Sequence, residues 1–335
     1  MSRSIRIGTF NLYNLVLPNI SYYENRLYTA EEYTKKKHWI ADQLNRMQAD
    51  CVGFQEVFHE QALQEVLAET QGYNNANLIV ANPTGEKPTV ALVSKLPILR
   101  HEVIEAFPQA AILALSGEDA PLSHFAHPVL KADIVLDETI ECTVFVVHLK
   151  SKRPVIAEGK DRHDPIELTK GKIRSLIQRA AETVALRVLL LETMQHSNRP
   201  VILMGDINDN DRAVTSRLLS GESPDPNWEN QYKQQNWDVL LYFAKDIQAR
   251  QTRGDFYFTH MHDAYYESLD HILLSQEFMS QNPHHIAKVQ YVSVFNDHLI
   301  DQSLTNHPIE VWKSDHGQVI VQIELRRSHP IELSL

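Results

Sequence analysis

The segment from Pro200 to Asp211, PVILMGDINDND, restricts the possible folds more than any other part of the chain. Its apolar residues, Val201 to Met204, are typical of a short strand that is buried on both faces of a sheet. Gly205 and five Asp or Asn side chains follow at once. Short polar groups at the end of a buried strand cost free energy unless a loop, a helix cap or a cation uses them. The segment therefore indicates either a catalytic or cation-binding loop, or a loop that caps a helix beginning near Ala213.

Other predicted strands also lead to polar residues. The segment Ile5–Phe10 alternates apolar and polar side chains, as a half-buried strand does, and Asn11 follows it. Four more predicted strands have such residues at or near an end, and one has one inside it. Glu56 follows 51–54, His148 follows 140–147, and Asp206 and Asn208 follow 201–204. Asp270 lies within 269–274, and Asp315 and His316 precede 319–325.

Further strands are predicted at 76–81, 89–94, 98–106, 129–136 and 256–259, and helices at 29–49, 59–70, 173–195 and 213–219. Thr29 and Glu32 have the spacing of a capping box at the start of the first helix. The segments 109–127, 221–237 and 282–308 are predicted to be loops. Because helices alternate with strands, the pattern favours an α/β architecture in which helices cover sheet faces. We expect the strand ends, with their polar residues, to share one edge.

The polar residues collected in this way suit metal-assisted hydrolysis of a phosphoester. Carboxylates such as Glu56 and Asp315 are hard oxygen ligands for Mg²⁺ or Mn²⁺, and an amide such as Asn11 can add a neutral oxygen. Histidines can protonate or hold phosphoryl oxygens or act as a general base. An aspartate bonded to one of them, such as Asp270, would fix its tautomer.

Six motifs occur in the order and at the approximate spacing of one known family: GTFNLYNL, GFQEV, VVHLKSK, GDINDN, SLDHILLS and SDHGQV. On these motifs the chain resembles the endonuclease/exonuclease/phosphatase (DNase I-like) superfamily over nearly its whole length. The motif details are most similar to those of bacterial nucleases. The resemblance implies a four-layer α/β sandwich, in which two mixed β-sheets pack face to face with helices outside.

The resemblance also implies a metal site. Glu56, in QEV, matches the principal metal ligand of the family, with Asn11 and Asp315 as assisting ligands for Mg²⁺ or Mn²⁺. His148 stands where DNase I and the phosphatases have a histidine and where repair enzymes of the exonuclease III type have a tyrosine. The chain is therefore less similar to an abasic-site repair enzyme.

Catalytic roles are implied for five residues in all: His148, Asp206, Asn208, Asp270 and His316. The Asp206–Asn208 pair matches the GDxN motif that positions nucleophile and phosphate, and His316 matches the histidine that Asp270 orients. Whether Asp206 or the Asp270–His316 pair takes the proton from water stays open at this point. The phosphatase branch has Cys-Asp-Arg where this chain has Leu-Asp-His at 269–271, which disfavours an inositol phosphatase.

A local excess of basic residues follows His148. From Lys150 to Arg179 there are nine Lys or Arg against four Asp or Glu. Such an excess beside a metal centre suits a phosphodiester polymer, although a solvated helix face and loop would show the same composition. We expect Lys150 and Lys152 to contact phosphate together with Asn208, and Arg179 to do so less directly.

The bulk properties limit the remaining classes. The net charge of −11 argues against a protein that binds nucleic acid through broad basic faces, but not against local phosphate contacts. The two cysteines, Cys51 and Cys142, are expected to be buried and reduced. The N-terminus has no apolar signal region and no apolar run reaches bilayer length, so we expect a cytoplasmic protein, although a removed signal peptide would leave no trace. No composition break divides the chain, which predicts a single domain over 1–335 with a frayed tail at 326–335.

Several other features are expected to have no role in the site. The histidines at 59, 101, 124, 127, 284 and 285 lack zinc-binding spacing, and most are predicted to be surface residues. Asp297-His298 resembles Asp315-His316 but stands in a predicted loop.

The sequence therefore predicts a divalent-metal-dependent phosphodiesterase, in the first place a nuclease with DNA, or else RNA, as its substrate. One alternative is a sphingomyelinase-like enzyme or a phosphoesterase for small molecules or inositol phosphates. Another is a scaffold that has kept the fold and lost catalysis, but such a scaffold predicts gaps in the set of site residues, and the matched positions have none. Substrate choice depends on loops, whose chemistry is not decided by one sequence.

Overall fold

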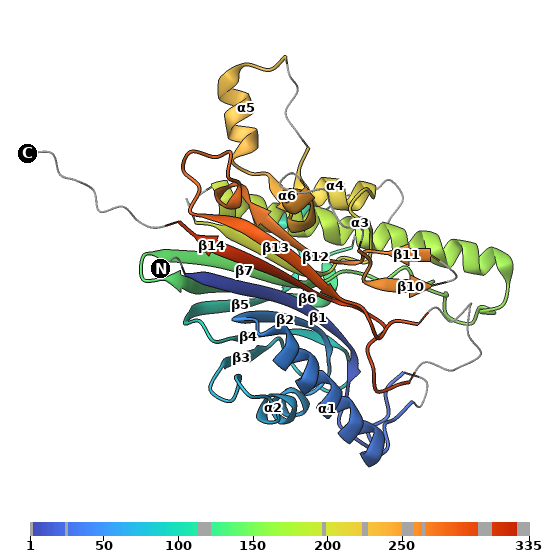
Figure 1. Cartoon of the computed structure of the whole chain (residues 1–335). Helices are drawn as coiled ribbons and strands as arrows, with labels where there is room; N and C mark the ends of the chain where they lie inside the picture. The colour runs from blue at the N-terminus through green and yellow to red at the C-terminus, as the bar shows by residue number, and fades with distance from the viewer. Residues whose placement is uncertain are drawn as a thin grey trace, which may run out of the picture.

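The structure is a computed structural model and describes residues 3–23, 26–112, 122–195, 199–222, 227–249, 257–262, 265–300 and 310–326. Within these residues, two mixed six-stranded sheets dominate the molecule (Figure 1). The strands of the first sheet, in spatial order, are β13 (Ala287–Phe295), β14 (Gln318–Leu325), β1 (Ser4–Leu15), β2 (Cys51–Val57), β4 (Thr89–Ser94) and β3 (Asn77–Val80). Those of the second are β5 (Ile98–Ala106), β6 (His124–Asp137), β7 (Ile140–His148), β8 (Val201–Asp206), β12 (Asp270–Ser275) and β9 (Leu241–Phe243).

Each sheet has a parallel pair near its centre, β1 with β2 and β7 with β8, and antiparallel neighbours elsewhere. The sheets pack face to face over an apolar core to which β1, β2 and β4 contribute one side and β7, β8 and β12 the other. Cys51 and Cys142 both lie in this core as free thiols, as expected from the sequence. Two short strands, β10 (His260–His262) and β11 (Tyr265–Glu267), form a separate hairpin.

Helices cover the outer faces of both sheets (Figure 1). The elements are α1 (Ala30–Met47), α2 (Glu60–Ala68), α3 (Pro165–Gln195), α4 (Val214–Ser220), α5 (Asn230–Trp237), α6 (Ala244–Ala249) and the 3₁₀ turns η1 (Gln109–Ala111) and η2 (Gln276–Phe278). The first two pack on the first sheet, and α3 packs on the second. This arrangement confirms the predicted four-layer sandwich. None of the helices in the described ranges is long and apolar enough to cross a membrane.

Most element positions agree with the sequence predictions. The capping box is present, because the Thr29 hydroxyl accepts from the Glu32 backbone N–H and the Glu32 carboxylate accepts from the Thr29 N–H. One helix is longer than predicted. The prediction began it at 173, whereas α3 begins at Pro165, where the missing N–H costs nothing and the Asp164 carboxylate accepts from the Ile166 N–H. Its first two turns are mostly exposed, so no apolar periodicity marked them.

All three predicted loops contain regular structure, and one predicted strand does not form. The predicted loop 109–127 includes η1 and the first residues of β6. The predicted loop 221–237 includes α5, a short helix of polar residues whose composition gave no amphipathic signal. The predicted loop 282–308 includes β13, in which a bulge between Val289 and Tyr291 interrupts the alternation of side chains. Residues 257–259 are not a strand, and Phe256 lies outside the described residues. Except for Arg326, the predicted tail also lies outside them.

Candidate active site

Three strands of the second sheet deliver one polar residue each to a single row. In the ladder register, His148 at the end of β7 pairs with Asp206 at the end of β8, and Asp206 pairs with Asp270 at the start of β12. Gly205 allows this close packing, because its φ is +143° and a Cβ there would lie 2.0 Å from the Val147 carbonyl oxygen. Glycine is the residue that tolerates both conditions. The apolar run of β8 thus ends at a position that only glycine can occupy.

One oxygen atom lies at the centre of the site. The Oδ2 atom of Asp206 is 3.2 Å from Nδ2 of Asn11, 3.7 Å from Nε2 of His148 and 3.8 Å from Nε2 of His316. Asn11 belongs to the first sheet, so its contact with Asp206 joins the two sheets at their common edge. The other carboxylate oxygen of Asp206 accepts the backbone N–H of Asn208 at 2.8 Å.

His316 is oriented by Asp270. Its Nδ1 lies 2.8 Å from Oδ2 of Asp270, a charge-assisted hydrogen bond inside the protein, since Asp270 is fully buried and His316 is 7% exposed. Burial by itself disfavours the imidazolium, but the neighbouring carboxylates of Asp270 and Asp206 outweigh it and raise the pKa of His316 well above its usual range. The surroundings of the ring therefore favour its doubly protonated form.

The pKa of Asp206 is raised as well. Burial raises it to about 7; the charge of His316 opposes the rise and the nearby carboxylate of Asp270 adds to it. A carboxylate with a pKa near neutrality is suited to take a proton from water and to give it up again. The surroundings thus favour the protonated form of His316 and bring the pKa of Asp206 close to neutrality.

The predicted hard-cation site has the right donors. Burial and the charge of Asp315 raise the pKa of Glu56. The Oδ1 atom of Asp315 is buried without a hydrogen-bond partner in the described part of the chain. Two carboxylates that repel each other and an oxygen without a partner fit a bound divalent cation, and a set of oxygen donors suits Mg²⁺ or Mn²⁺. Glu56 also has a φ of +61°, a strained backbone at the end of β2.

Asn11 faces the carboxylates with its amide nitrogen. Its oxygen accepts the backbone N–H of Tyr13 at 3.0 Å, which only the oxygen can do, and its nitrogen points to Glu56 at 3.4 Å and to Asp206. In this geometry Asn11 orients Glu56 and Asp206. Asn208 is similarly engaged, because its Nδ2 donates to the Leu149 carbonyl oxygen at 2.9 Å. It fixes the loop after β7 against the loop after β8.

His148 lies against a second histidine that sequence reasoning placed outside the site. The rings of His127 and His148 stack with centroids 4.3 Å apart and an interplanar angle of 10°. Burial, together with the neighbouring histidines and Lys150, lowers the pKa of His148 well below its usual range. Of the six histidines that were expected to have no role, His127 is thus half-buried and in contact with a candidate site residue, and it is β6 that places it there.

The basic residues predicted to contact phosphate have different surroundings. Lys150 is half-buried, and its Nζ donates to the Ser151 hydroxyl at 3.4 Å, while Lys152 pairs with Glu267 at 2.9 Å. The Arg179 side chain is buried, with Nε 2.8 Å from Oδ2 of Asp209. It also donates to the Lys150 carbonyl oxygen, so it holds two loops and has no exposed face for phosphate. Of the three, Lys150 is the one whose charge contributes to the lowered pKa of His148.

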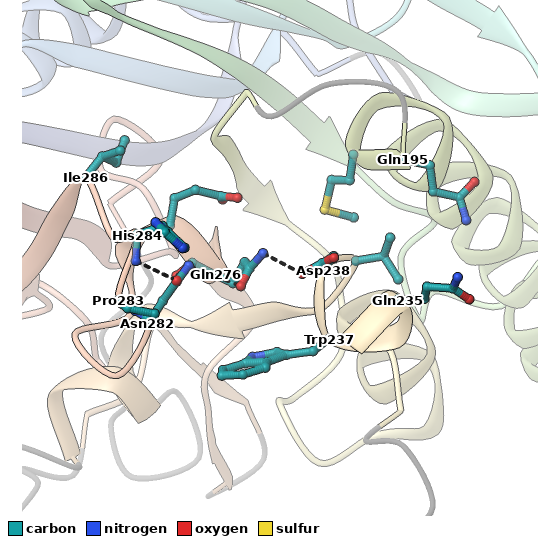
Figure 2. A pocket seen from close by; sticks show the side chains of 12 residues that line it. Gln195, Gln235, Trp237, Asp238, Gln276, Asn282, Pro283, His284 and Ile286 are labelled. Atoms are coloured by element: carbon teal, nitrogen blue, oxygen red, sulfur yellow. Dashed lines mark hydrogen bonds between the residues drawn. The ribbon is translucent and has the colours of Figure 1, made fainter. Parts of the chain in front are cut away.

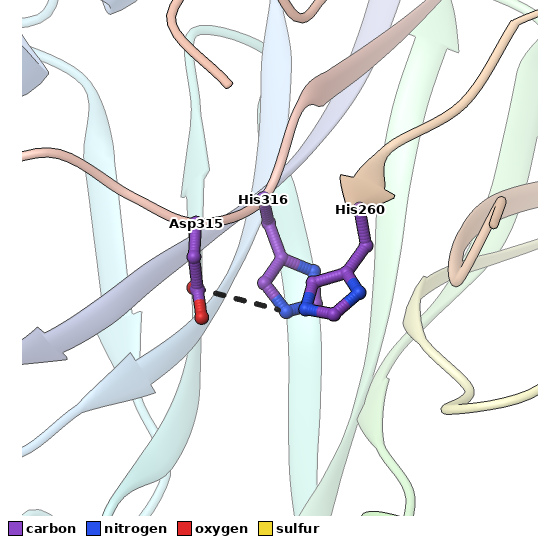
Figure 3. A group of neighbouring side chains, drawn as sticks. All are labelled: His260, Asp315 and His316. Atoms are coloured by element: carbon purple, nitrogen blue, oxygen red, sulfur yellow. Dashed lines mark ion pairs between the residues drawn. The ribbon is translucent and has the colours of Figure 1, made fainter. Parts of the chain in front are cut away.

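Two further residues near the site were not predicted from the sequence. His260, in β10, forms an isolated bridge with His316, and the two rings lie 5.1 Å apart (Figure 3). Lys36, in α1, is fully buried, and its ammonium donates to the Tyr13 carbonyl oxygen at 2.9 Å. The helical spacing of Tyr33, Lys36 and Ile40 places this lysine on the buried face of α1, a signal that was available in the sequence.

His298 has a supporting position. Its Nε2 lies 3.0 Å from the carbonyl oxygen of His316, and its ring packs edge-on against Trp39. His298 thus supports the loop that carries His316. This agrees with the expectation that the Asp297-His298 pair is not part of the site.

A cavity of about 840 Å³ lies elsewhere in the described part of the chain. It is lined by amide, acidic and aromatic side chains, among them Gln276, Asp238 and Trp237, with Gln276 bonded to Asp238 at 3.0 Å (Figure 2). Gln276 follows the last residue of β12, whereas Asp270 is the first. The cavity is therefore at the end of β12 remote from the catalytic row. Its size is no argument for it as the active site, because it contains none of the converging groups described above.

Comparisons with known proteins agree with this architecture. A truncated Caenorhabditis elegans TDP2 has a TM-score of 0.57 and 13% identity, with 96% of this chain and 97% of that chain covered. The human Nocturnin catalytic domain has a TM-score of 0.56 and 13% identity, with 97% and 96% covered. An endonuclease/exonuclease/phosphatase from Bacteroides vulgatus has a TM-score of 0.56 and 13% identity, with 97% and 100% covered.

At such identity these similarities show the fold. No curated protein matches the sequence. The sequence profile described as the Endonuclease/Exonuclease/phosphatase family matches residues 8–316, which include every site residue discussed above. On that match and on the fold, the chain belongs to the endonuclease/exonuclease/phosphatase family.

Proposed function

We propose that the protein is a Mg²⁺- or Mn²⁺-dependent phosphodiesterase that cleaves nucleic acid, with DNA as the preferred substrate. The observation that carries the proposal is the position of Asp206 Oδ2, which faces three nitrogen atoms from three different elements. Family membership supports a phosphoesterase. The identity of the metal, the roles of the site residues and the choice of substrate are proposed here.

In this mechanism the protein positions a water molecule and a phosphate between Asp206 and the two histidines. Asp206, with its pKa of about 7, accepts the proton of the attacking water. The imidazolium of His316 and the neutral ring of His148 hold phosphate oxygens as negative charge develops on them. Glu56 and Asp315 would hold the cation, which supplies Lewis-acid stabilisation of the phosphate when bound.

The choice of nucleic acid rests on local charge. Lys150 follows His148 by two residues and is half-buried beside the row, so a phosphate held by His148 has a cation next to it. The Lys150 ammonium forms a hydrogen bond with the Ser151 hydroxyl and no salt bridge with another described residue. A polyanion meets this local cation although the chain as a whole is acidic, with a net charge of −11. Strong salt dependence of binding is the expected signature.

The experiment is hydrolysis by metal-stripped protein. Supercoiled plasmid, single-stranded DNA, structured RNA, sphingomyelin and an inositol polyphosphate are each offered with and without added Mg²⁺ or Mn²⁺. His316→Gln and Glu56→Gln are compared with His101→Gln, an exposed histidine on the edge strand β5. Far-UV circular dichroism of each variant checks that it is folded.

Plasmid nicking that requires metal, is lost in His316→Gln and Glu56→Gln and is kept in His101→Gln would support the proposal. If the nucleic acids stay intact while sphingomyelin or the inositol phosphate is hydrolysed, the site assignment stands and the substrate assignment is wrong. If folded, metal-bound protein hydrolyses none of the substrates, the proposal of a phosphodiesterase is overturned.

A further inference from the structure

His260 and His316 are fixed next to each other by the backbone. They are opposite residues of an isolated antiparallel bridge, and the Gly317 N–H donates to the Thr259 carbonyl oxygen at 2.7 Å. Residues directly opposite in such a bridge place their side chains on the same face. Figure 3 accordingly shows the two imidazoles side by side, with the Asp315 carboxylate next to them.

The ligand atoms of these residues converge. Nitrogen atoms of His260 and His316 and a carboxylate oxygen of Asp315 all lie within 4.8 Å of one another. The His316 Nε2 atom and the Asp315 Oδ1 atom are 4.0 Å apart, and this oxygen is the buried atom without a hydrogen-bond partner in the described residues. Four-coordinate Zn²⁺ places its ligand atoms roughly 3.3 Å apart. Shifts of up to about 1.5 Å would therefore close the group on an ion, and both Asp315 and His260 are partly exposed.

The surroundings of His316 complete the arrangement. Its Nδ1 is bonded to Asp270 at 2.8 Å, which directs Nε2 toward Asp315 and His260. Histidines that bind metals commonly donate their second nitrogen to a carboxylate in this way, which fixes the ring and raises its basicity. Two imidazoles and one carboxylate form a different donor set from the oxygen ligands near Glu56. Such a set favours a borderline-soft transition metal over Mg²⁺.

We propose that His260, Asp315 and His316 form a second metal site, selective for Zn²⁺, and that Zn²⁺ at this site inhibits the enzyme. The inhibition rests on the proposed function. Zn²⁺ displaces the proton from His316 Nε2 and occupies the position from which that nitrogen holds a phosphate oxygen. It also takes Asp315 from the cation site at Glu56. Mg²⁺ and Mn²⁺ then activate the protein, whereas Zn²⁺ blocks it.

Binding is tested without any substrate. Metal-stripped protein is titrated with Co²⁺, whose intense visible absorption reports four-coordinate nitrogen and oxygen ligands, and with Zn²⁺ by calorimetry. The variants are His260→Asn and Asp315→Asn, with His101→Asn as a histidine control on an exposed strand. We expect one Zn²⁺ per chain, with affinity reduced about 100-fold or more in both ligand variants, since even outer partners of metal ligands contribute 10–100-fold. His101→Asn should bind as the unaltered protein does.

Activity forms a separate arm. Each variant is compared with its own rate in Mg²⁺, and the concentration of Zn²⁺ that halves this rate is measured. We expect that concentration to rise about tenfold or more in His260→Asn and to stay unchanged in His101→Asn. His260→Asn keeps Glu56, Asp206 and the Asp270–His316 pair, so its own Mg²⁺ rate is the proper reference.

The two arms separate this proposal from the proposed function. A Co²⁺ spectrum that depends on His260, in a protein that hydrolyses no phosphoester, would support the metal site and overturn the function. The opposite result is a protein that hydrolyses substrate with Mg²⁺ and whose His260→Asn variant binds Co²⁺ and Zn²⁺ as tightly as the unaltered protein does. That result would overturn the metal site alone. Circular dichroism again confirms that the variants are folded. If His260→Asn is unfolded, His260→Gln gives the deciding result, because Asp315 also belongs to the cation site at Glu56.

Discussion

Asp206 and Asp270 lie directly opposite each other on neighbouring antiparallel strands, with 1% and 0% of their surface exposed. Two like charges in such a position repel each other, and burial adds to the cost. His316 contacts both carboxylates, through Nδ1 at 2.8 Å and Nε2 at 3.8 Å. A positive charge on His316, which these carboxylates favour, offsets part of that repulsion.

The first prediction concerns stability and activity together. Because the pKa of Asp206 rises from 3.8 to about 7 on folding, the folded protein binds more protons than the unfolded chain between these values. The contribution of Asp206 to stability therefore falls as pH rises through this interval. We expect Asp206→Asn to raise the Tm by a few degrees at about pH 8 and to abolish hydrolysis. Scanning calorimetry of both proteins at about pH 8 and pH 4 measures this. A Tm of Asp206→Asn below that of the unaltered protein at about pH 8 would contradict it.

The second prediction is the pH profile of the reaction. The value of kcat/KM should increase up to about pH 7 as Asp206 loses its proton, and should decrease only at higher pH as His316 loses its own. A bound cation lowers the pKa of nearby carboxylates, so saturating Mn²⁺ should move the acidic limb to lower pH. Rates measured at low and at saturating Mn²⁺ provide the comparison. An acidic limb that does not move with metal would exclude Asp206 as the proton acceptor.

The third prediction concerns Lys36. Its ammonium and the Tyr28 hydroxyl both donate to the Tyr13 carbonyl oxygen, at 2.9 and 3.2 Å, in a turn where Tyr13 and Asn14 have φ values of 50° and 61°. This strained turn also supplies the N–H that orients Asn11. Lys36→Met should therefore weaken Mn²⁺ binding, measured by calorimetry, because the turn that fixes Asn11 loses one of its two donors. Unchanged affinity would limit Lys36 to a packing role.

The same variant has a pH signature. Burial lowers the pKa of Lys36 from 10.5 to about 7, so the folded protein binds fewer protons than the unfolded chain between these values. The free energy of unfolding should gain up to about 1.4 kcal/mol per pH unit across this interval from Lys36 alone. Urea denaturation of the unaltered protein and of Lys36→Met should differ in slope accordingly.

The fourth prediction concerns Glu182, a buried carboxylate of α3. One of its oxygens accepts the Ala126 N–H at 2.9 Å and the other accepts the Lys150 N–H at 2.7 Å, so it holds the segments next to both stacked histidines. Glutamine has one acceptor oxygen, and Glu182→Gln leaves one buried N–H without a partner. We expect a loss of about 1–3 kcal/mol in the free energy of unfolding and a lower kcat. Glu192→Gln, an exposed change on the same helix, should have neither effect.

The sequence predicted the part of the site that depends on local pattern. A buried apolar run followed by polar residues is visible at Val201–Asp206 and at Cys51–Glu56, and both are strands that end at the site. The order of motifs then predicted the four layers and the family, which the structure and the family match confirm. The individual roles of the site residues stay predictions, and the experiments above test them.

The parts that sequence reasoning missed depend on contacts between distant segments. His260 reaches His316 only through a bridge between residues 56 positions apart, and His127 reaches His148 only through the register of β6 and β7. Neither relationship leaves a local periodic signal. The polar helix α5 was missed for another reason: residues 230–237 do not have an apolar face.

In the proposed mechanism, the row formed by His148, Asp206 and Asp270 also makes activity a measure of correct strand register. Side chains alternate between the faces of a strand, so a slip of β7, β8 or β12 by one residue would turn a member of the row away from the site. A molecule in a slipped register would be inactive even if it were compact. Core substitutions remote from the row should consequently lower total activity in proportion to the fraction of molecules that fail to fold, while each folded molecule retains its full rate.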